Sequence, residues 1–577
     1  MRWIDDQPFD PKFPFWTRAN VGEVLPLAPS PLGWDLLFDA ACRPGWRDCM
    51  IQRLGIDEDE VDVRNPEVIG VFGGYAYLCA TMLRVRADRT PGFTAEALDA
   101  AYFGDHPDVP SFVSEPWHDN PRTTEVMTGW LVWVMGTMEQ DELEADRVLS
   151  LQIRANRPDL RNATPHELLE RARDLQPVAR RLFDQHINQS GAASIGPGVL
   201  GAICAAIGRP EAPLALFAGL GGVDSAAPSY AMWSLSRLVN DAAALEWAFD
   251  EGIDGLHQRL VDRAQADTDD ASFVDRFDEF LADFGSRGPN EWDISSDVWE
   301  TKPDIALAAV DRMRLAPSSS APRLQTDERE KERLTLSAEI ESVLAGTPEL
   351  LGQFHAALVS AATYVPGRER SKTSIIRVVG EMRLAMWELG RRSVEQGEMV
   401  KPSDICMLFC DELESLVEGT LTGVCELVAE RLAHHEWLTS LEPPFIINGK
   451  PAPNTEWPRR GADEIAANVV GDVLHGMPGC PGVVRGIARV VLDAGDPGAL
   501  GAGEILVAPM TDSAWTPLFV AAAGVVVDVG AALSHAIIVS RELGIPCVVS
   551  VTGGTSRIPD GAVIEVDGAA GTVTIVG

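Results

Sequence analysis

The adjacent residues Ser534 and His535 are the strongest candidates for covalent chemistry in this chain. Imidazole titrates near neutrality, and its neutral nitrogen is a competent nucleophile toward phosphorus. A β-branched run at residues 525–527 predicts a buried strand, and helical periodicity from residue 536 to Gly544 places His535 in the first turn of a helix. Unpaired N–H groups and the helix dipole stabilise an anion there. The pattern is consistent with a phosphorylated histidine. It is equally consistent with a structural histidine that occupies the first turn of a helix beside a serine cap.

The most cationic stretch of the chain lies upstream, between residues 368 and 392. Arg368 and Lys372 are four positions apart, which places both on one face of a helix. Such a pair could neutralise the charge on the equatorial oxygens of a transferred phosphoryl group. A solvated, salt-bridged helix face that includes Glu369 and Glu381 is an equally good interpretation. The basic residues of the stretch are Arg368, Arg370, Lys372, Arg377, Arg383, Arg391 and Arg392.

The run around His535, GAALSHAIIVSRELGIPCVV, resembles the phosphohistidine signature of the PEP-utilising enzymes. This swivelling domain is shared by pyruvate phosphate dikinase, phosphoenolpyruvate synthase and rifampin phosphotransferase, and the resemblance covers residues 477–577. It implies a multidomain fold, in which a mainly α-helical substrate-binding region precedes a small C-terminal β/β/α swivelling phosphohistidine domain. One departure is Leu533, where the dikinases carry a threonine that serves regulation in some of them.

A second resemblance lies in the loop of residues 284–303, FGSRGPNEWDISSDVWETKP. It is similar to the Arg-Gly-x-x-Glu-x-Asp loop of the family, with Arg287, Glu291 and Asp293 at the matching positions. One cation beside two carboxylates suits either a structural ion-pair cluster or a phosphate-handling loop. The family's Pro-Arg-Trp that follows is replaced by Asp-Val-Trp at residues 297–299, so a cation is absent there.

The resemblance implies roles for individual residues. The stretch around Arg368 is similar to the family's central helix pair, whose arginine and lysine at this spacing face the phosphohistidine. The implied catalytic residues are His535, Arg368 and Lys372. The implied phosphate- or substrate-binding residues are Arg377, Arg287 and Ser534. No metal ligand is expected in this chain.

Composition shifts divide the chain into five segments. Residues 316–331 are rich in Pro, Ser and charge. Residues 441–464 are rich in Pro without helical or strand periodicity, and a short helix is expected between them and the tail domain. Residues 191–220 are apolar and rich in small side chains, so a pocket is expected in the first half. The segments are an N-terminal part of the helical substrate-binding region (1–315), a linker or exposed excursion (316–331), a helical part with the basic helix (332–440), a tether (441–476) and the swivelling domain (477–577).

Charge and cysteine content limit the partners. The chain has 48 Lys and Arg against 86 Asp and Glu, a net charge of −38, which disfavours binding to nucleic acid or to an anionic membrane. Its nine cysteines include no CxxC pair, so reduced thiols in a cytoplasm are the simplest expectation. The acidic, aromatic opening residues do not have the pattern of a secretion signal.

The predicted function is that of a phosphotransferase component. Residues 16–26 and 31–34 resemble the start of the family's substrate-binding domain, which directly follows an ATP-grasp domain in those enzymes. ATP and Mg²⁺ are therefore expected on a separate ATP-grasp partner. His535 would pass a phosphoryl group from ATP, with AMP and phosphate as products, to a hydroxyl of a small hydrophobic or aromatic substrate. The alternatives are phosphoenolpyruvate-dependent transfer with a partner barrel, and a non-catalytic regulatory or binding subunit.

Overall fold

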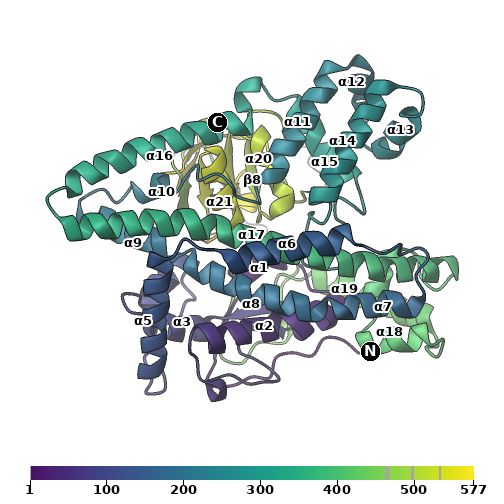
Figure 1. Ribbon diagram of the computed structural model, residues 1–577, viewed down its shortest axis with the longest axis horizontal. Coiled ribbons are helices and arrows are strands. Elements are labelled where there is room, and N and C mark those ends of the chain that lie inside the picture. The colour runs from purple at the N-terminus through teal and green to yellow at the C-terminus, as the bar shows by residue number, and fades with distance from the viewer. Residues whose placement is uncertain (1, 105, 462–466, 495–499, 532–533) are drawn as a thin grey trace.

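The protein consists of two bodies packed on either side of one long helix, α17 (Pro348–Glu395) (Figure 1). The structure is a computed structural model that describes residues 2–104, 106–461, 467–494, 500–531 and 534–577. The lower body in Figure 1 contains α2 (Arg43–Asp48), α8 (Gln176–Ala192), α18 (Cys410–Val417) and α19 (Val424–Thr439). The upper body contains α11 (Ala227–Asp241), α14 (Thr268–Phe284), α15 (Asp304–Arg314), α16 (Pro322–Leu344) and the C-terminal sheet.

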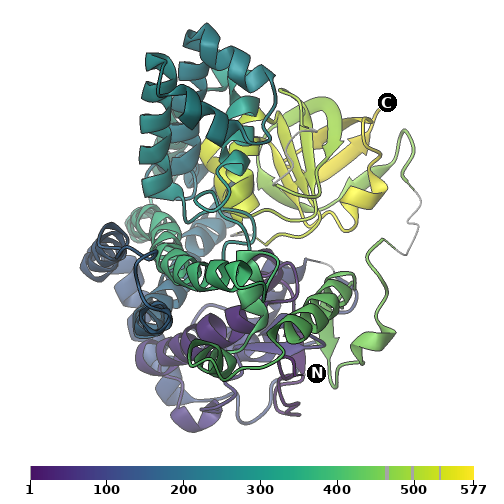
Figure 2. The same ribbon diagram turned by 90° about the vertical axis from the view of Figure 1, so that its right-hand side faces the viewer.

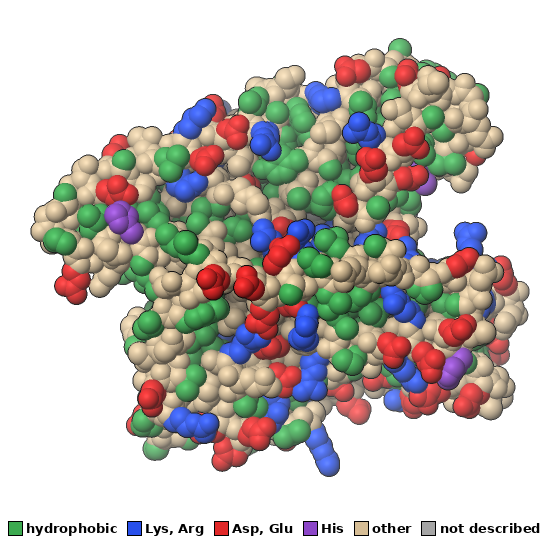
Figure 3. Space-filling view, viewed as in Figure 1, with side chains coloured by type: hydrophobic (Ala, Val, Ile, Leu, Met, Phe, Trp, Pro, Cys, Tyr) green, Lys and Arg blue, Asp and Glu red, His purple; other side chains and the backbone are tan. Residues whose placement is uncertain are grey.

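Helix α17 is the central support of the molecule. Its apolar side chains Ile375, Val379 and Met382, spaced by three to four residues, are fully buried. Lys and Arg side chains gather along the junction between the two bodies (Figure 3). Among the described residues, no helix is both long enough and apolar enough to cross a membrane.

A four-stranded antiparallel sheet joins the start of the chain to the segment after α19. Two of its strands form a hairpin, whose turn uses Gly73 and Gly74 at positive φ, where a side chain would be strained. The segment predicted as a tether, residues 441–476, contains two strands. Residues 446–448 pair with residues 15–17, and residues 473–475 join the C-terminal sheet, because distant partners supply an order that the local sequence does not show. The strands of this first sheet are β2 (Ile69–Phe72), β3 (Tyr75–Cys79), β1 (Phe15–Thr17) and β4 (Ile446–Asn448), in that order.

The segment predicted as a linker or exposed excursion, residues 316–331, includes the start of α16 at residue 322. Pro322 occupies the first helical position, at which a missing N–H has no cost. The charged residues that follow are good helix formers. Thr326 of this helix donates a hydrogen bond to the backbone carbonyl of Glu542, with an O···O distance of 3.1 Å. The segment is therefore a packed element against the C-terminal region.

The C-terminal region is an eight-stranded sheet with three short helices. Its central strands run parallel, and residues 525–527 are fully buried in the strand that precedes His535, as the sequence predicts. The described residues between β4 and this sheet, 449–461 and 467–472, run along the outside of the molecule (Figure 2). The strand order is β5 (Val473–His475), β12 (Thr572–Ile575), β11 (Val563–Asp567), β7 (Val483–Val490), β8 (Ile505–Ala508), β9 (Gly524–Val527), β10 (Cys547–Val549) and β6 (Met477–Cys480). The helices are α20 (Thr516–Ala521), α21 (His535–Leu543) and α22 (Gly554–Arg557).

Candidate active site

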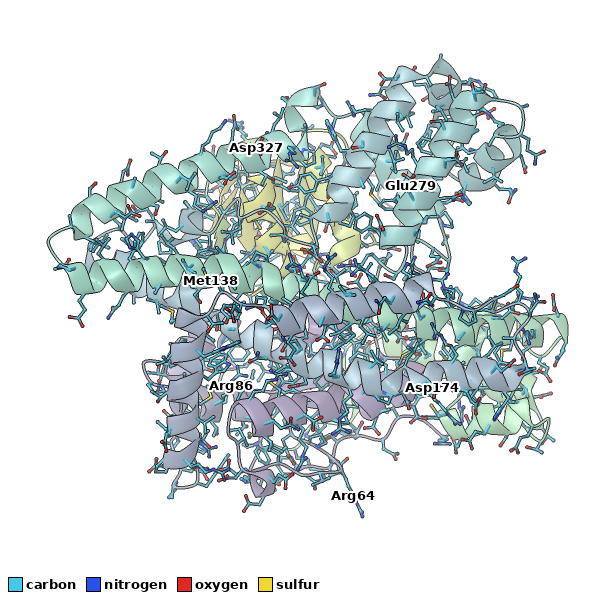
Figure 4. All side chains as sticks on the ribbon, viewed as in Figure 1. Arg64, Arg86, Met138, Asp174, Glu279 and Asp327 are labelled. Atoms are coloured by element: carbon cyan, nitrogen blue, oxygen red, sulfur yellow. The ribbon has the colours of Figure 1, made fainter. Side chains whose placement is uncertain are left out.

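A cavity of about 860 Å³ lies between the lower body and the C-terminal region. Its lining is mainly apolar, and it includes residues of α8, α3 (Ala80–Asp88), α4 (Ala95–Phe103), α5 (Pro121–Gly136), α9 (Ile195–Ala206) and α10 (Pro213–Leu216). Residues 191–220 contribute part of this lining, as predicted from their small and apolar side chains. Arg86, which also lines it, lies in the lower body below α17 (Figure 4). The charged lining includes Glu23, Arg368, Glu369, Lys372 and Asp512, with His535 beside them.

His535 is the first residue of α21, as the sequence predicts, and its side chain is held by two hydroxyl groups. Its Nε2 lies 2.9 Å from Oγ1 of Thr516, and its Nδ1 lies 3.4 Å from Oγ1 of Thr511. Only 5% of the residue is exposed, and the ring meets Phe519 edge to face. The imidazole thus has a fixed orientation at the cavity wall.

Burial, followed by the charge of Lys372, lowers the pKa of His535 well below its usual value. The carboxylate of Glu369 acts in the opposite direction, while Arg287 and Arg368 add to the lowering. The imidazole is therefore neutral at physiological pH. A neutral ring nitrogen is the form that can attack phosphorus.

Arg368 and Lys372 occupy one face of α17 and line the cavity with His535. Arg368 forms an ion pair with Glu369, and Nζ of Lys372 lies 3.4 Å from Oε1 of Glu291. Burial acts to raise the pKa of Glu369, but the two cations outweigh it and the pKa falls to about 2. The structure brings the predicted Arg368, Lys372 and His535 together at one end of the cavity.

Arg287 lies behind this group and not among the cavity-lining residues. Its guanidinium is 1% exposed and donates to Glu291, with a distance of 2.8 Å from Nε to Oε2, and to Oγ1 of Thr373 at 2.8 Å. Asp293 of the same loop accepts hydrogen bonds from the backbone N–H and the hydroxyl of Ser30. The loop of residues 284–303 is thus an ion-pair cluster that supports α17. The charge of Arg287 also lowers the pKa of His535, although Arg287 does not line the cavity.

Arg287→Met should destabilise the protein by about 3–5 kcal/mol, because it leaves the buried Glu291 carboxylate without its bidentate partner. The measurement is urea unfolding followed by tryptophan fluorescence. Arg391→Met is the matched control, since Arg391 makes its ion pairs at the surface of the same long helix, and it should leave the midpoint unchanged. Equal midpoints for Arg287→Met and wild type would contradict the structural importance of this pair.

Arg377 does not line the cavity, so its predicted role in phosphate binding stays a prediction. Arg377 follows Lys372 by five residues, a rotation of roughly 140° around the helix after one full turn. It is buried near Asp224, and burial lowers its pKa to about 10. Ser534 precedes α21 and is buried, but its hydroxyl makes no hydrogen bond and caps no backbone N–H in the described part of the chain. Leu533 lies outside the described residues.

Four polar residues at the site were not predicted. Glu23, in the short helix α1 (Val21–Val24), lines the cavity, as do Thr511 and Asp512, while Thr516 bonds the imidazole. Asp512 also accepts a hydrogen bond from the backbone N–H of Asn290, at 2.9 Å, across the interface between the C-terminal region and the helical region. All four lie in stretches that resemble the family, near residue 20 and in TDSAWTP, and this resemblance was the only available signal.

Comparison with known proteins gives two family matches. Residues 185–369 match the fourth domain of rifampicin (rifampin) phosphotransferase, and residues 500–571 match the mobile domain of PEP-utilising enzymes. The second match includes His535, Thr511 and Thr516. The first ends at Glu369, one residue after Arg368.

Curated relatives agree with these matches. The prodigiosin synthesizing transferase PigC of Serratia marcescens is 32% identical over 351 residues, 59% of this chain and 38% of that protein. A rifampicin phosphotransferase of Streptomyces sviceus is 30% identical over 310 residues, 52% of this chain and 34% of that enzyme. The uncharacterized phosphotransferase YvkC of Bacillus subtilis is 24% identical over 326 residues, 55% of this chain and 38% of that protein.

The chain spans about a third of the length of these relatives, between 34% and 38%. The matched mobile domain holds the imidazole, and the relatives include named phosphotransferases. The resemblance identified in the sequence is thereby confirmed: residues 500–571 match the mobile domain of PEP-utilising enzymes, and residues 185–369 match a domain of rifampicin phosphotransferase. These likenesses support a phosphotransferase.

Proposed function

We propose that His535 carries a phosphoryl group from ATP to the hydroxyl of an apolar small molecule held in the cavity. The observation that carries this proposal is that a neutral, oriented histidine and the cations Arg368 and Lys372 line one mainly apolar cavity. Nucleophile, charge-neutralising groups and acceptor space are the three parts that phosphoryl transfer through histidine needs.

The reaction has two transfers. In the first, by analogy with the dikinases, an imidazole nitrogen attacks the β-phosphorus of ATP, and AMP leaves with the electron pair of the broken P–O bond. Water then cleaves the bond between the β- and γ-phosphoryl groups, so that phosphate leaves and one phosphoryl group stays on His535. We place ATP and Mg²⁺ on an ATP-grasp partner. In the second, the acceptor oxygen attacks phosphorus, and the N–P bond breaks with its electron pair returning to the imidazole. Arg368 and Lys372 neutralise the phosphoryl oxygens as the bonds exchange.

One histidine must visit two sites, so the C-terminal region has to move. Contacts that hold the docked position include Arg541, which lies over the ring of Phe217 at 4.6 Å, and hydrogen bonds of Glu542 and Asp512 to the helical region. The outer chain segment after α19 gives the length that such a movement needs. The arrangement supports the docked geometry as the acceptor-transfer position of a swivelling domain.

The lining of the cavity favours a hydrophobic or aromatic acceptor. Its volume lies within the range of pockets for drug-sized ligands, roughly 300–1,000 Å³. Trp130, Phe183 and Phe217 are among the side chains that line it. A small anion such as pyruvate would leave most of this apolar surface without a partner, whereas a larger apolar alcohol or phenol would cover it.

The neutral fluorescent probe N-phenyl-1-naphthylamine should bind the chain with one strong site in the cavity. Ala101→Trp places an indole at a partly exposed position of the lining and should weaken binding by at least about tenfold, through lost volume and contact area. Ala264→Trp, after α13 (Leu256–Arg263) and outside the lining, is the control. Equal probe affinity in wild type and Ala101→Trp would contradict this assignment of the binding space.

The donor is tested by incubating the chain with a cognate ATP-grasp protein, Mg²⁺ and ATP labelled at either the β- or the γ-position. The proposal predicts acid-labile, base-stable label on the chain from the β-position only, and only with the partner present. Label from phosphoenolpyruvate in place of ATP would contradict the ATP-grasp assignment. No label from any donor would favour a regulatory subunit.

A further inference from the structure

Glu23 presents an unpaired carboxylate oxygen beside the reacting histidine. The residue is half-buried, but its Oε1 is closed off from solvent and has no hydrogen-bond partner among the described residues. Buried polar atoms nearly always have a partner, so an exception calls for an explanation. Glu23 also lines the cavity, which means that a bound molecule could supply the missing partner.

The surroundings of Glu23 are those of the transfer site. Arg368 and Lys372 act on its charge, the backbone N–H groups of His535 and Ala531 approach its carboxyl, and Tyr102 of α4 is a further neighbour. Burial outweighs the two cations and raises the pKa of Glu23 to about 7. A carboxyl group with this pKa is partly ionised at neutral pH and is a much stronger base than an ordinary glutamate.

The other acids and bases of the cavity are less suited to accept a proton. Glu369 is paired with Arg368 and has its pKa lowered to about 2. Burial raises the pKa of Asp512 to about 6, but both of its carboxylate oxygens already accept hydrogen bonds, from the backbone N–H groups of Asn290 and Ala514. Nδ1 of His186 is hydrogen-bonded to the hydroxyl of Ser371, and burial lowers the pKa of His186 to about 3.

We infer that Glu23 is the general base that takes the proton from the acceptor hydroxyl, a catalytic role that rests on the proposed function. As the acceptor oxygen forms its bond to phosphorus, its O–H proton moves to the carboxylate of Glu23. The N–P bond to His535 breaks, and the imidazole keeps the electron pair. The proton leaves Glu23 for solvent once the phosphate ester departs.

The test separates loading of His535 from discharge. The full chain is loaded with ³²P-labelled phosphoramidate, a small-molecule donor that phosphorylates histidine without a protein partner, and label found on His535→Ala is subtracted. Loss of label is then followed with benzyl alcohol as the acceptor probe and with water alone. Glu23→Gln keeps the shape of the side chain but cannot accept the proton, and Glu23→Asp keeps the base one methylene shorter.

Glu23→Gln should load like wild type and discharge at least about 10²-fold more slowly, the usual size of a general-base contribution. Glu23→Asp should recover part of the rate, which a purely structural role would not predict. Glu58→Gln, at an exposed surface position, is the matched control and should behave as wild type. Discharge of Glu23→Gln at the wild-type rate would overturn the role of Glu23 alone. A wild-type chain that takes no label at His535 would instead overturn the proposed function, and this inference with it.

Discussion

His535→Ala should abolish phosphoryl labelling of the chain and reduce turnover by a factor on the order of 10⁶, the scale seen when a covalent nucleophile is removed. The reason is that both transfers pass through one nitrogen. Thr511 and Thr516 hold the ring but have no comparable nucleophilicity, so neither hydroxyl can replace it. Label is measured as acid-labile, base-stable radioactivity on the purified chain after exposure to the labelled donor.

The control for this substitution is His355→Ala. His355 is an exposed histidine that contacts Glu341. It lies on α17, more than three helical turns before Arg368, and does not line the cavity. The His355→Ala chain should take up the label and turn over substrate at the wild-type level. Label that persists on His535→Ala would mean that another residue carries the phosphoryl group. The histidine would then be no more than the first residue of a helix.

Removing either cation of the pair should have the second-largest effect. Arg368→Met and Lys372→Met should each slow transfer from His535 to an acceptor by about 10²–10³-fold, since each removes one group that neutralises charge in the transition state. Methionine keeps much of the apolar stem, so packing along α17 is largely retained. The measurement is single-turnover loss of label from pre-loaded chain, with benzyl alcohol as acceptor.

Arg370→Met is the matched control on the same turn of α17. Arg370 faces Asp224 at 3.7 Å and is not part of the cavity lining, so its loss should change the transfer rate little. Arg368→Lys should recover only part of the rate, because a lysine lacks the planar two-point geometry of arginine. Equal effects of the substitutions at positions 368, 370 and 372 would show that overall charge, and not placement in the cavity, controls the reaction.

Periodicity predicted the parts of the site that depend on local structure. The β-branched run at 525–527 and the helical spacing after His535 fixed a strand and a helix start, and both are present. The spacing of Arg368 and Lys372 fixed a shared helix face, and that face lines the cavity. Arg377 does not share this face, because five residues along a helix change the direction of a side chain.

The remaining parts depend on contacts between distant segments. Glu23 lies in a four-residue helix with no periodic pattern, and only the fold brings it beside a histidine 512 positions later. Strand β4 exists because residues 15–17 offer an edge to pair with. The first residues of α16 are charged and follow a proline, a composition that is typical of a linker. In the structure they form a helix that packs near Glu542. Local pattern cannot show such pairings.

A single-turnover chase tests the central claim most directly. Wild-type chain carrying ³²P on His535 is mixed with unlabelled apolar alcohols and phenols that fit the cavity, and the products are separated by chromatography. The account predicts that label leaves the protein as an organic phosphate ester with at least one of these acceptors, and that Ala101→Trp and Arg368→Met slow this step without preventing loading. Label that leaves only as inorganic phosphate, at one rate in every variant, would contradict it.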